Sequence, residues 1–182
     1  MPVQQEIKSQ LAKLLATEDI IVEHKQVQTA SFNVESRVLI LPLWEKASND
    51  VYDMLVGHEV GHALFTPNQW DWLEEGLPIG VVNVVEDARI EKLMKRKYMG
   101  IAKSFFKGYT ELHQDNFFDI NVDKVDQMNL ADRANLYFKI GSFLDLTFTS
   151  EEQEIIDLIK NCETFKDTLS AAKALHLFCK EE

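Results

Sequence analysis

The pentapeptide His58-Glu59-Val60-Gly61-His62 places the strongest constraint on how this chain can fold. Residues four positions apart are neighbours on a helix surface, so a helix here would bring both imidazoles to one metal ion. The chain contains five His, and two of them lie in this pentapeptide. Glu59 follows the first His and could face a water molecule held by the metal. Two His ligands and a nearby carboxylate base are what zinc-dependent hydrolysis requires.

The flanking residues predict that this motif lies on a helix. Apolar residues recur close to the i, i+3, i+4 spacing of a largely buried helix: Val51, Met54, Leu55, Val60, Ala63 and Leu64. Asn49 or Asp50 could cap the start, and Pro67 disfavours helix at Thr66. Gly61 costs about 1 kcal/mol relative to Ala within a helix, which is tolerable if another backbone element or a metal-bound substrate must come close. The alternative to a metal site is an amphipathic helix whose two His are exposed or satisfied by hydrogen bonds.

A third protein ligand is predicted on a second helix. Its apolar face is formed by Val81, Val82, Val84, Val85, Ile90, Leu93 and Met94. Glu86 borders this face, and a buried carboxylate is costly unless it is paired or bound to a metal. Glu86 is therefore the first candidate and Asp87 the alternative. The acid that does not bind metal could orient a His ring, and Glu91 and Arg89 are further candidates for that supporting role. An exposed acidic patch, balanced by basic residues of the same helix, is the competing interpretation.

The motif HEVGH followed by a Glu on a second helix resembles the gluzincin branch of the zincin metallopeptidases. More narrowly, HEVGHALF together with NVVEDARIEKLMKRKY is similar to metallopeptidases of bacteriophages. It is also similar to the peptidase-like region found beside von Willebrand A-type domains in cobaltochelatase-like proteins. The resemblance covers roughly residues 36 to 100.

This resemblance implies a zincin-like fold and a Zn²⁺ ion held by His58, His62 and Glu86, with Glu59 as the general base. The thermolysin-type pattern has an Asp four residues after its Glu ligand, and that position is Ile90 here. If Asp87 were the ligand, the corresponding position would be Glu91.

The residues before the motif predict a small β-sheet. The segment from 35 to 44 is rich in β-branched and aliphatic residues and is typical of a strand, and segments 20–22 and 30–34 are its expected partners. In zincins an edge strand above the metal helix holds an extended substrate, as in strand addition to a sheet. The 35–44 strand is either such an edge strand or an ordinary core strand.

Most of the remaining chain is predicted to be helical. The acidic, aromatic segment 115–127 is expected to be a loop that could shape a pocket. The expected helices are 3–15, 131–146, 150–159 (opened by a capping box of Ser150 and Gln153) and 165–179. The predicted fold class is α+β, zincin-like and mostly helical with a small N-terminal β-sheet. One domain is expected to span residues 1–182, with the sheet, the metal helix and the third-ligand helix in 1–100 and a helical part in 101–182.

Composition limits the class of protein and the cellular location that we expect. A chain of 182 residues that is 46% hydrophobic can form a core, and its net charge of −11 argues against a general nucleic-acid binder. The polar N-terminal residues are not typical of a signal peptide, and no apolar run of about 18 residues could span a membrane. We therefore expect a cytoplasmic location, in the host cytoplasm if the protein is encoded by a phage.

Two functions of different class are compatible with these residues. The first is a zinc metallopeptidase acting on a protein or peptide, in which Tyr98, Tyr109, His113 or Arg89 could stabilise the oxyanion. The second is a catalytically silent zincin-fold interaction or scaffold protein, with a structural metal or none, that binds a protein partner in a larger assembly. The intact Glu59 favours the first, because a purely structural zinc site needs no base.

Overall fold

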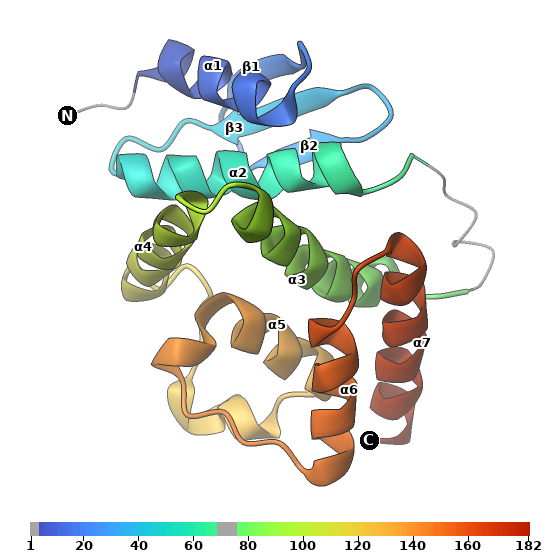
Figure 1. Ribbon diagram of the computed structural model, residues 1–182. Coiled ribbons are helices and arrows are strands. Elements are labelled where there is room, and N and C mark those ends of the chain that lie inside the picture. The colour runs from blue at the N-terminus through green and yellow to red at the C-terminus, as the bar shows by residue number, and fades with distance from the viewer. Residues whose placement is uncertain (1–3, 69–75) are drawn as a thin grey trace. The chain divides into compact units, whose positions relative to one another are not determined.

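Three short strands form the sheet in the computed structural model, which describes residues 4–68 and 76–182 (Figure 1). They are β1 (Ile21–Lys25), β2 (Ser31–Asn33) and β3 (Val38–Pro42), in the order β1-β3-β2. Strand β3 pairs in parallel with β1 and antiparallel with β2. Because both edges of β3 are paired, it is a core strand and cannot be the substrate-binding edge strand considered above.

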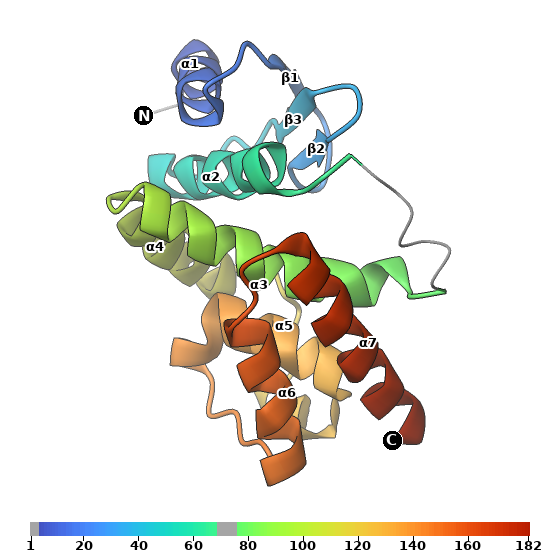
Figure 2. The same cartoon turned by 45° about the vertical axis from the view of Figure 1, so that its right-hand side comes forward.

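The predicted metal helix is α2 (Asn49–Phe65), which is packed on two sides. The sheet and α1 (Gln5–Ala16) lie on one side of α2, and α4 (Ile101–Gln114) lies on the other (Figures 1 and 2). The cap of α2 is Ser48, not Asn49 or Asp50, because Ser48 has an extended backbone and its side chain accepts from the Val51 N–H. The helix ends before Thr66, as predicted from Pro67.

Glycines allow the helices around α2 to pack closely. A Cβ atom on Gly61 would lie 2.8 Å from Ile90 Cδ1, and one on Gly108 of α4 would lie 2.7 Å from Met54 Cβ. The second helix, α3 (Ile79–Lys97), contributes Ile90 to the contact with Gly61. Gly61 thus has a close neighbour, but this neighbour is a buried side chain of α3 and not the backbone element or substrate that was expected.

The chain divides into two compact units. Unit 1 comprises Met1–Asn68 and Ile90–Asp115, and unit 2 comprises Gln69–Arg89 and Asn116–Glu182. Helix α3 therefore contributes residues to both. Besides the start of α3, unit 2 contains α5 (Leu130–Ile140), α6 (Ser150–Lys160) and α7 (Phe165–Glu181) and the short 3₁₀ segments η2 (Val122–Gln127) and η3 (Gly141–Phe143). Its core includes Val82, Val85, Leu130, Ile156 and Leu175.

One predicted helix end and one predicted capping box in unit 2 were wrong. Helix α5 ends at Ile140 rather than at 146, and a short 3₁₀ turn follows. The capping box of α6 is formed by Thr149 and Glu152, one position before the predicted pair, because Thr149 is the residue with extended backbone. Segment 115–127 is partly 3₁₀ helix.

The predicted α+β class, mostly helical with a small N-terminal sheet, is confirmed. The start of the first predicted helix, residue 3, lies outside the described residues. Across the described ranges, none of the helices has the length and apolar character needed to cross a lipid bilayer.

Candidate metal centre

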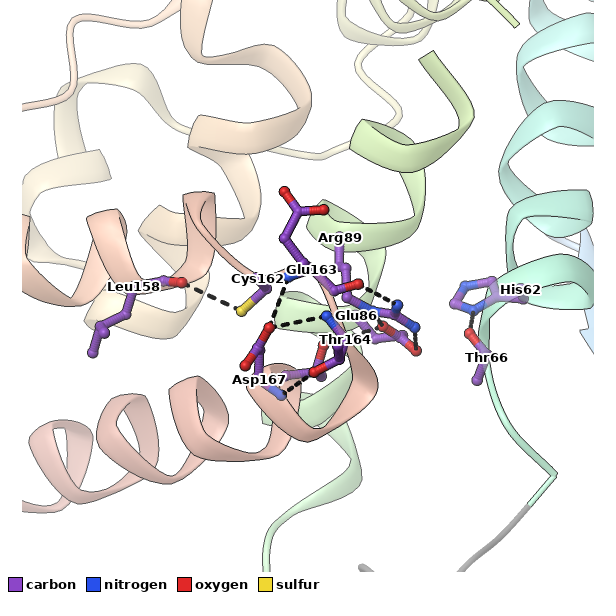
Figure 3. A network of polar contacts seen from close by, with 10 residues as sticks. His62, Thr66, Glu86, Arg89, Leu158, Cys162, Glu163, Thr164 and Asp167 are labelled. Atoms are coloured by element: carbon purple, nitrogen blue, oxygen red, sulfur yellow. Dashed lines mark hydrogen bonds and ion pairs between the residues drawn. The ribbon is translucent and has the colours of Figure 1, made fainter. Parts of the chain in front are cut away.

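The two imidazoles of the motif are adjacent on α2 and are both anchored at the same ring position. Their ring centroids are 5.1 Å apart and the rings are inclined at 76°. His58 Nδ1 lies 2.9 Å from Glu91 Oε1. His62 Nδ1 lies 2.9 Å from Thr66 Oγ1, as Figure 3 shows. A metal-binding His usually engages its second nitrogen in such a contact, which orients the ring. Nε2 is then the nitrogen of each ring that could bind a metal.

Glu59 lies on α2 next to His58, within unit 1. Its residue is 8% exposed, and the following residue, Val60, is fully buried. Within residues 4–68 and 76–182, no group forms a hydrogen bond or ion pair with this carboxylate. This carboxylate can therefore accept a hydrogen bond from a water molecule.

Glu86, the first candidate for a third ligand, takes part in a buried ion pair in unit 2. Arg89 Nε donates to Glu86 Oε1 at 2.6 Å and Arg89 Nη2 donates to Oε2 at 2.9 Å, so both carboxylate oxygens are engaged (Figure 3). Thr168 also donates to Oε1, at 3.2 Å, and Arg89 Nη1 donates to the carbonyl oxygen of Glu163. Glu86 and Arg89 are 2% and 3% exposed, so this pair is not the exposed charge balance considered from the sequence.

Asp87, the alternative ligand, is partly buried and projects from α3 in a different direction from Glu86. Its Oδ2 accepts from Lys139 Nζ at 3.1 Å within unit 2. Asp87 precedes Glu91 by four residues on one continuous helix, so the two side chains project from the same face. Glu91 is the residue that contacts His58.

The two tyrosines considered as oxyanion donors have hydroxyl groups engaged within unit 1. Tyr109 donates to Glu91 Oε1, and Tyr98 donates to the carbonyl oxygen of Leu15 at 2.7 Å. His113 lies on α4 and is partly exposed. The contact between Glu91 and His58 favours the supporting role predicted for Glu91.

Sequence reasoning did not find Thr66 or Thr168. Thr66 lies one helical turn after His62, so its contact with that ring could have been inferred from spacing. Thr168 contacts Glu86 across 82 positions of sequence, and no local pattern indicates it.

His24 lies on β1 with a buried Nε2 that has no hydrogen-bond partner among the described residues. Burial lowers the pKa of its imidazole.

Comparison with protein-family models, with curated protein sequences and with solved structures found no match to this chain.

Proposed function

We propose that this protein is a zinc-dependent metallopeptidase that hydrolyses peptide bonds of a protein or peptide substrate. The observation that carries the proposal is the pair of imidazoles on α2, each with Nδ1 engaged, beside the partly desolvated carboxylate of Glu59. Two imidazole nitrogens and a carboxylate oxygen are a donor set that suits Zn²⁺. The cytoplasm, or the host cytoplasm for a phage protein, is the location that goes with this function.

We take the third ligand to be Asp87 rather than Glu86, with the ligand set His58, His62 and Asp87. Both oxygens of Glu86 are engaged by Arg89, and freeing one would leave a buried guanidinium with an incomplete partner. Asp87 shares a helix face with Glu91, whose carboxylate contacts His58. The pair therefore repeats the order of the thermolysin-type pattern, a ligand followed four residues later by an acid that orients a ligand.

The chain's own residues supply the steps around the metal. Zn²⁺, when bound, would lower the pKa of a coordinated water and polarise the scissile carbonyl. Glu59 would accept a proton from that water and deliver it to the leaving amine.

Glu59→Gln tests the assignment of the base. We expect zinc to stay bound at about one ion per chain, because Glu59 is not a ligand, while peptide hydrolysis falls by about 10²- to 10⁴-fold. Zinc content would be measured by elemental analysis and hydrolysis with a library of fluorogenic peptides. Zinc binding by the wild-type protein without cleavage of any peptide would favour the silent scaffold protein instead.

Three substitutions on α3 and α5 test the ligand. Asp87→Asn should release zinc, whereas Glu86→Gln should retain it. Lys139→Met is the matched control, because it removes the ion-pair partner of Asp87 and leaves the carboxylate in place. If Lys139→Met released zinc as fully as Asp87→Asn, the ion pair rather than ligation would explain the loss. Zinc release by Glu86→Gln alone would assign the third ligand to Glu86.

A further inference from the structure

Three side chains from three helices of unit 1 form a chain of hydrogen bonds that ends on the motif. The hydroxyl of Tyr109 on α4 donates to Glu91 Oε1 on α3, and the same oxygen lies 2.9 Å from His58 Nδ1 on α2. Glu91 and Tyr109 are 3% and 7% exposed, so solvent competes little for these contacts. A buried hydrogen-bond chain of this kind restricts the orientation of each member.

The hydroxyl at the start of this chain is held in position by packing. The ring of Tyr109 stacks against Phe105, with centroids 6.2 Å apart and planes inclined at 27°. Phe105 is itself 1% exposed. The Tyr109 ring therefore has little freedom to turn, and its hydroxyl gives the Glu91 carboxylate a second fixed contact besides His58.

The chemistry of the chain determines where the His58 proton lies. An ionised carboxylate only accepts hydrogen bonds, so both groups that meet Glu91 Oε1 must be donors. His58 is then the tautomer with hydrogen on Nδ1, and its lone pair is on Nε2. We propose that Tyr109 is a positioning residue that orients Glu91 and, through it, fixes this tautomer of His58 before any metal binds.

The other imidazole lacks an equivalent constraint in its Nδ1 contact. His62 Nδ1 meets the hydroxyl of Thr66, which can either donate or accept, so this contact by itself is compatible with both tautomers. Of the two Nδ1 contacts, the one made by His58 therefore fixes a tautomer and the one made by His62 does not. The consequence for metal affinity rests on the proposed function, but the tautomer of His58 does not.

Tyr109→Phe tests the tautomer directly, because it removes the hydroxyl and keeps the ring that stacks on Phe105. Metal-free protein labelled with ¹⁵N in His would be studied by NMR, about two pH units above the usual imidazole pKa so that the rings are neutral. We expect His58 to be the Nδ1–H tautomer in the wild type. In the variant we expect a mixture, because a Glu91 carboxylate without the Tyr109 contact can turn away from His58 Nδ1, and we expect His62 to be unchanged. A His58 that carries its hydrogen on Nε2 in the wild type, or keeps the Nδ1–H tautomer in the variant, would overturn the proposal.

Tyr98→Phe is the matched control, since it removes a hydroxyl of the same unit that donates to Leu15 and not to Glu91. It should leave the His58 tautomer and the zinc affinity unchanged. In competition with a chelator, Tyr109→Phe should weaken zinc binding by roughly 10-fold or more. If the variant lost its fold, Glu91→Gln would replace it, and the same tautomer shift is expected.

The two readouts separate the two proposals. If wild-type protein bound no zinc, the metallopeptidase proposal would fail, while the NMR result would still decide the role of Tyr109. If the His58 tautomer shifted in Tyr109→Phe and zinc affinity did not change, the positioning role toward the metal would be refuted.

Discussion

Replacement of Gly61 by Ala tests whether the motif helix is packed against α3 as closely as the structure indicates. The added Cβ would lie 2.8 Å from Ile90 Cδ1 and 3.0 Å from Met94 Cγ, and both neighbours are fully buried. Overpacking of this kind costs about 1–3 kcal/mol, while Ala gains about 1 kcal/mol over Gly in a helix. We therefore expect the free energy of unfolding to fall by about 0–2 kcal/mol.

A second substitution identifies the neighbour that causes this loss. Ile90→Val removes Cδ1, the atom nearest to the new methyl group, and should cost about 0.5–1.5 kcal/mol alone. In the double variant the methyl of Ala occupies the vacated space, so the losses should not add. We expect a favourable coupling of about 1–2 kcal/mol, measured as a double-mutant cycle by urea unfolding followed by circular dichroism.

Additive losses, within about 0.5 kcal/mol, would show that Ile90 does not face Gly61 and would refute the packing described here. Gly80→Ala on α3, the helix of Ile90, is the control for helix propensity, because a Cβ there meets no atom within 4 Å. It should leave stability unchanged or raise it.

Four further predictions concern stability. Arg133→Ala should destabilise the protein by about 3 kcal/mol in urea unfolding, because it leaves the buried carboxylate of Glu152 without its partner. The hydrogen bond from Arg133 lowers the pKa of Glu152, so the wild type should lose stability as the pH falls through the acidic range, and Glu152→Gln should reduce that dependence. Burial lowers the pKa of His24, so the folded protein favours the neutral imidazole. The free energy of unfolding should therefore decrease as the pH falls below about 6.5, the usual imidazole pKa. His24→Gln should reduce this dependence on pH. Thr149→Ala should lower the melting temperature through the loss of about 1 kcal/mol of capping, whereas Ser150→Ala should have little effect; the reverse would move the cap back to the position expected from sequence.

Local patterns were sufficient for most of the secondary structure. The spacing of apolar residues predicted α2 and α3, and Pro67 predicted the end of α2. The caps of α2 and α6 were misplaced by one position, because Ser48 and Thr149 stand beside other residues that could also cap. The side chain that caps a helix is the one whose own backbone is extended just before the first helical residue. The capping propensities of neighbouring residues do not decide which residue this is.

The paired edges of β3 could not be predicted from its composition. A run of aliphatic residues is expected both in a core strand and in an apolar edge strand. The difference arises from β1 and β2, which pair with β3 on opposite sides.

The sequence alone determined that His58 and His62 share one side of a helix with Glu59 close by, because four-residue spacing is a property of the helix itself. The tertiary structure decided which acid meets which group. Glu91 reaches His58 across 33 positions, and Tyr109 reaches Glu91 across 18, because α2 packs closely against α3 at Gly61 and against α4 at Gly108. Glu86, by contrast, is paired with Arg89 only three residues away, but the burial that makes this pair costly to break comes from the surrounding helices of unit 2. Side-chain chemistry is set by sequence, whereas the partner of each buried charge is set by packing.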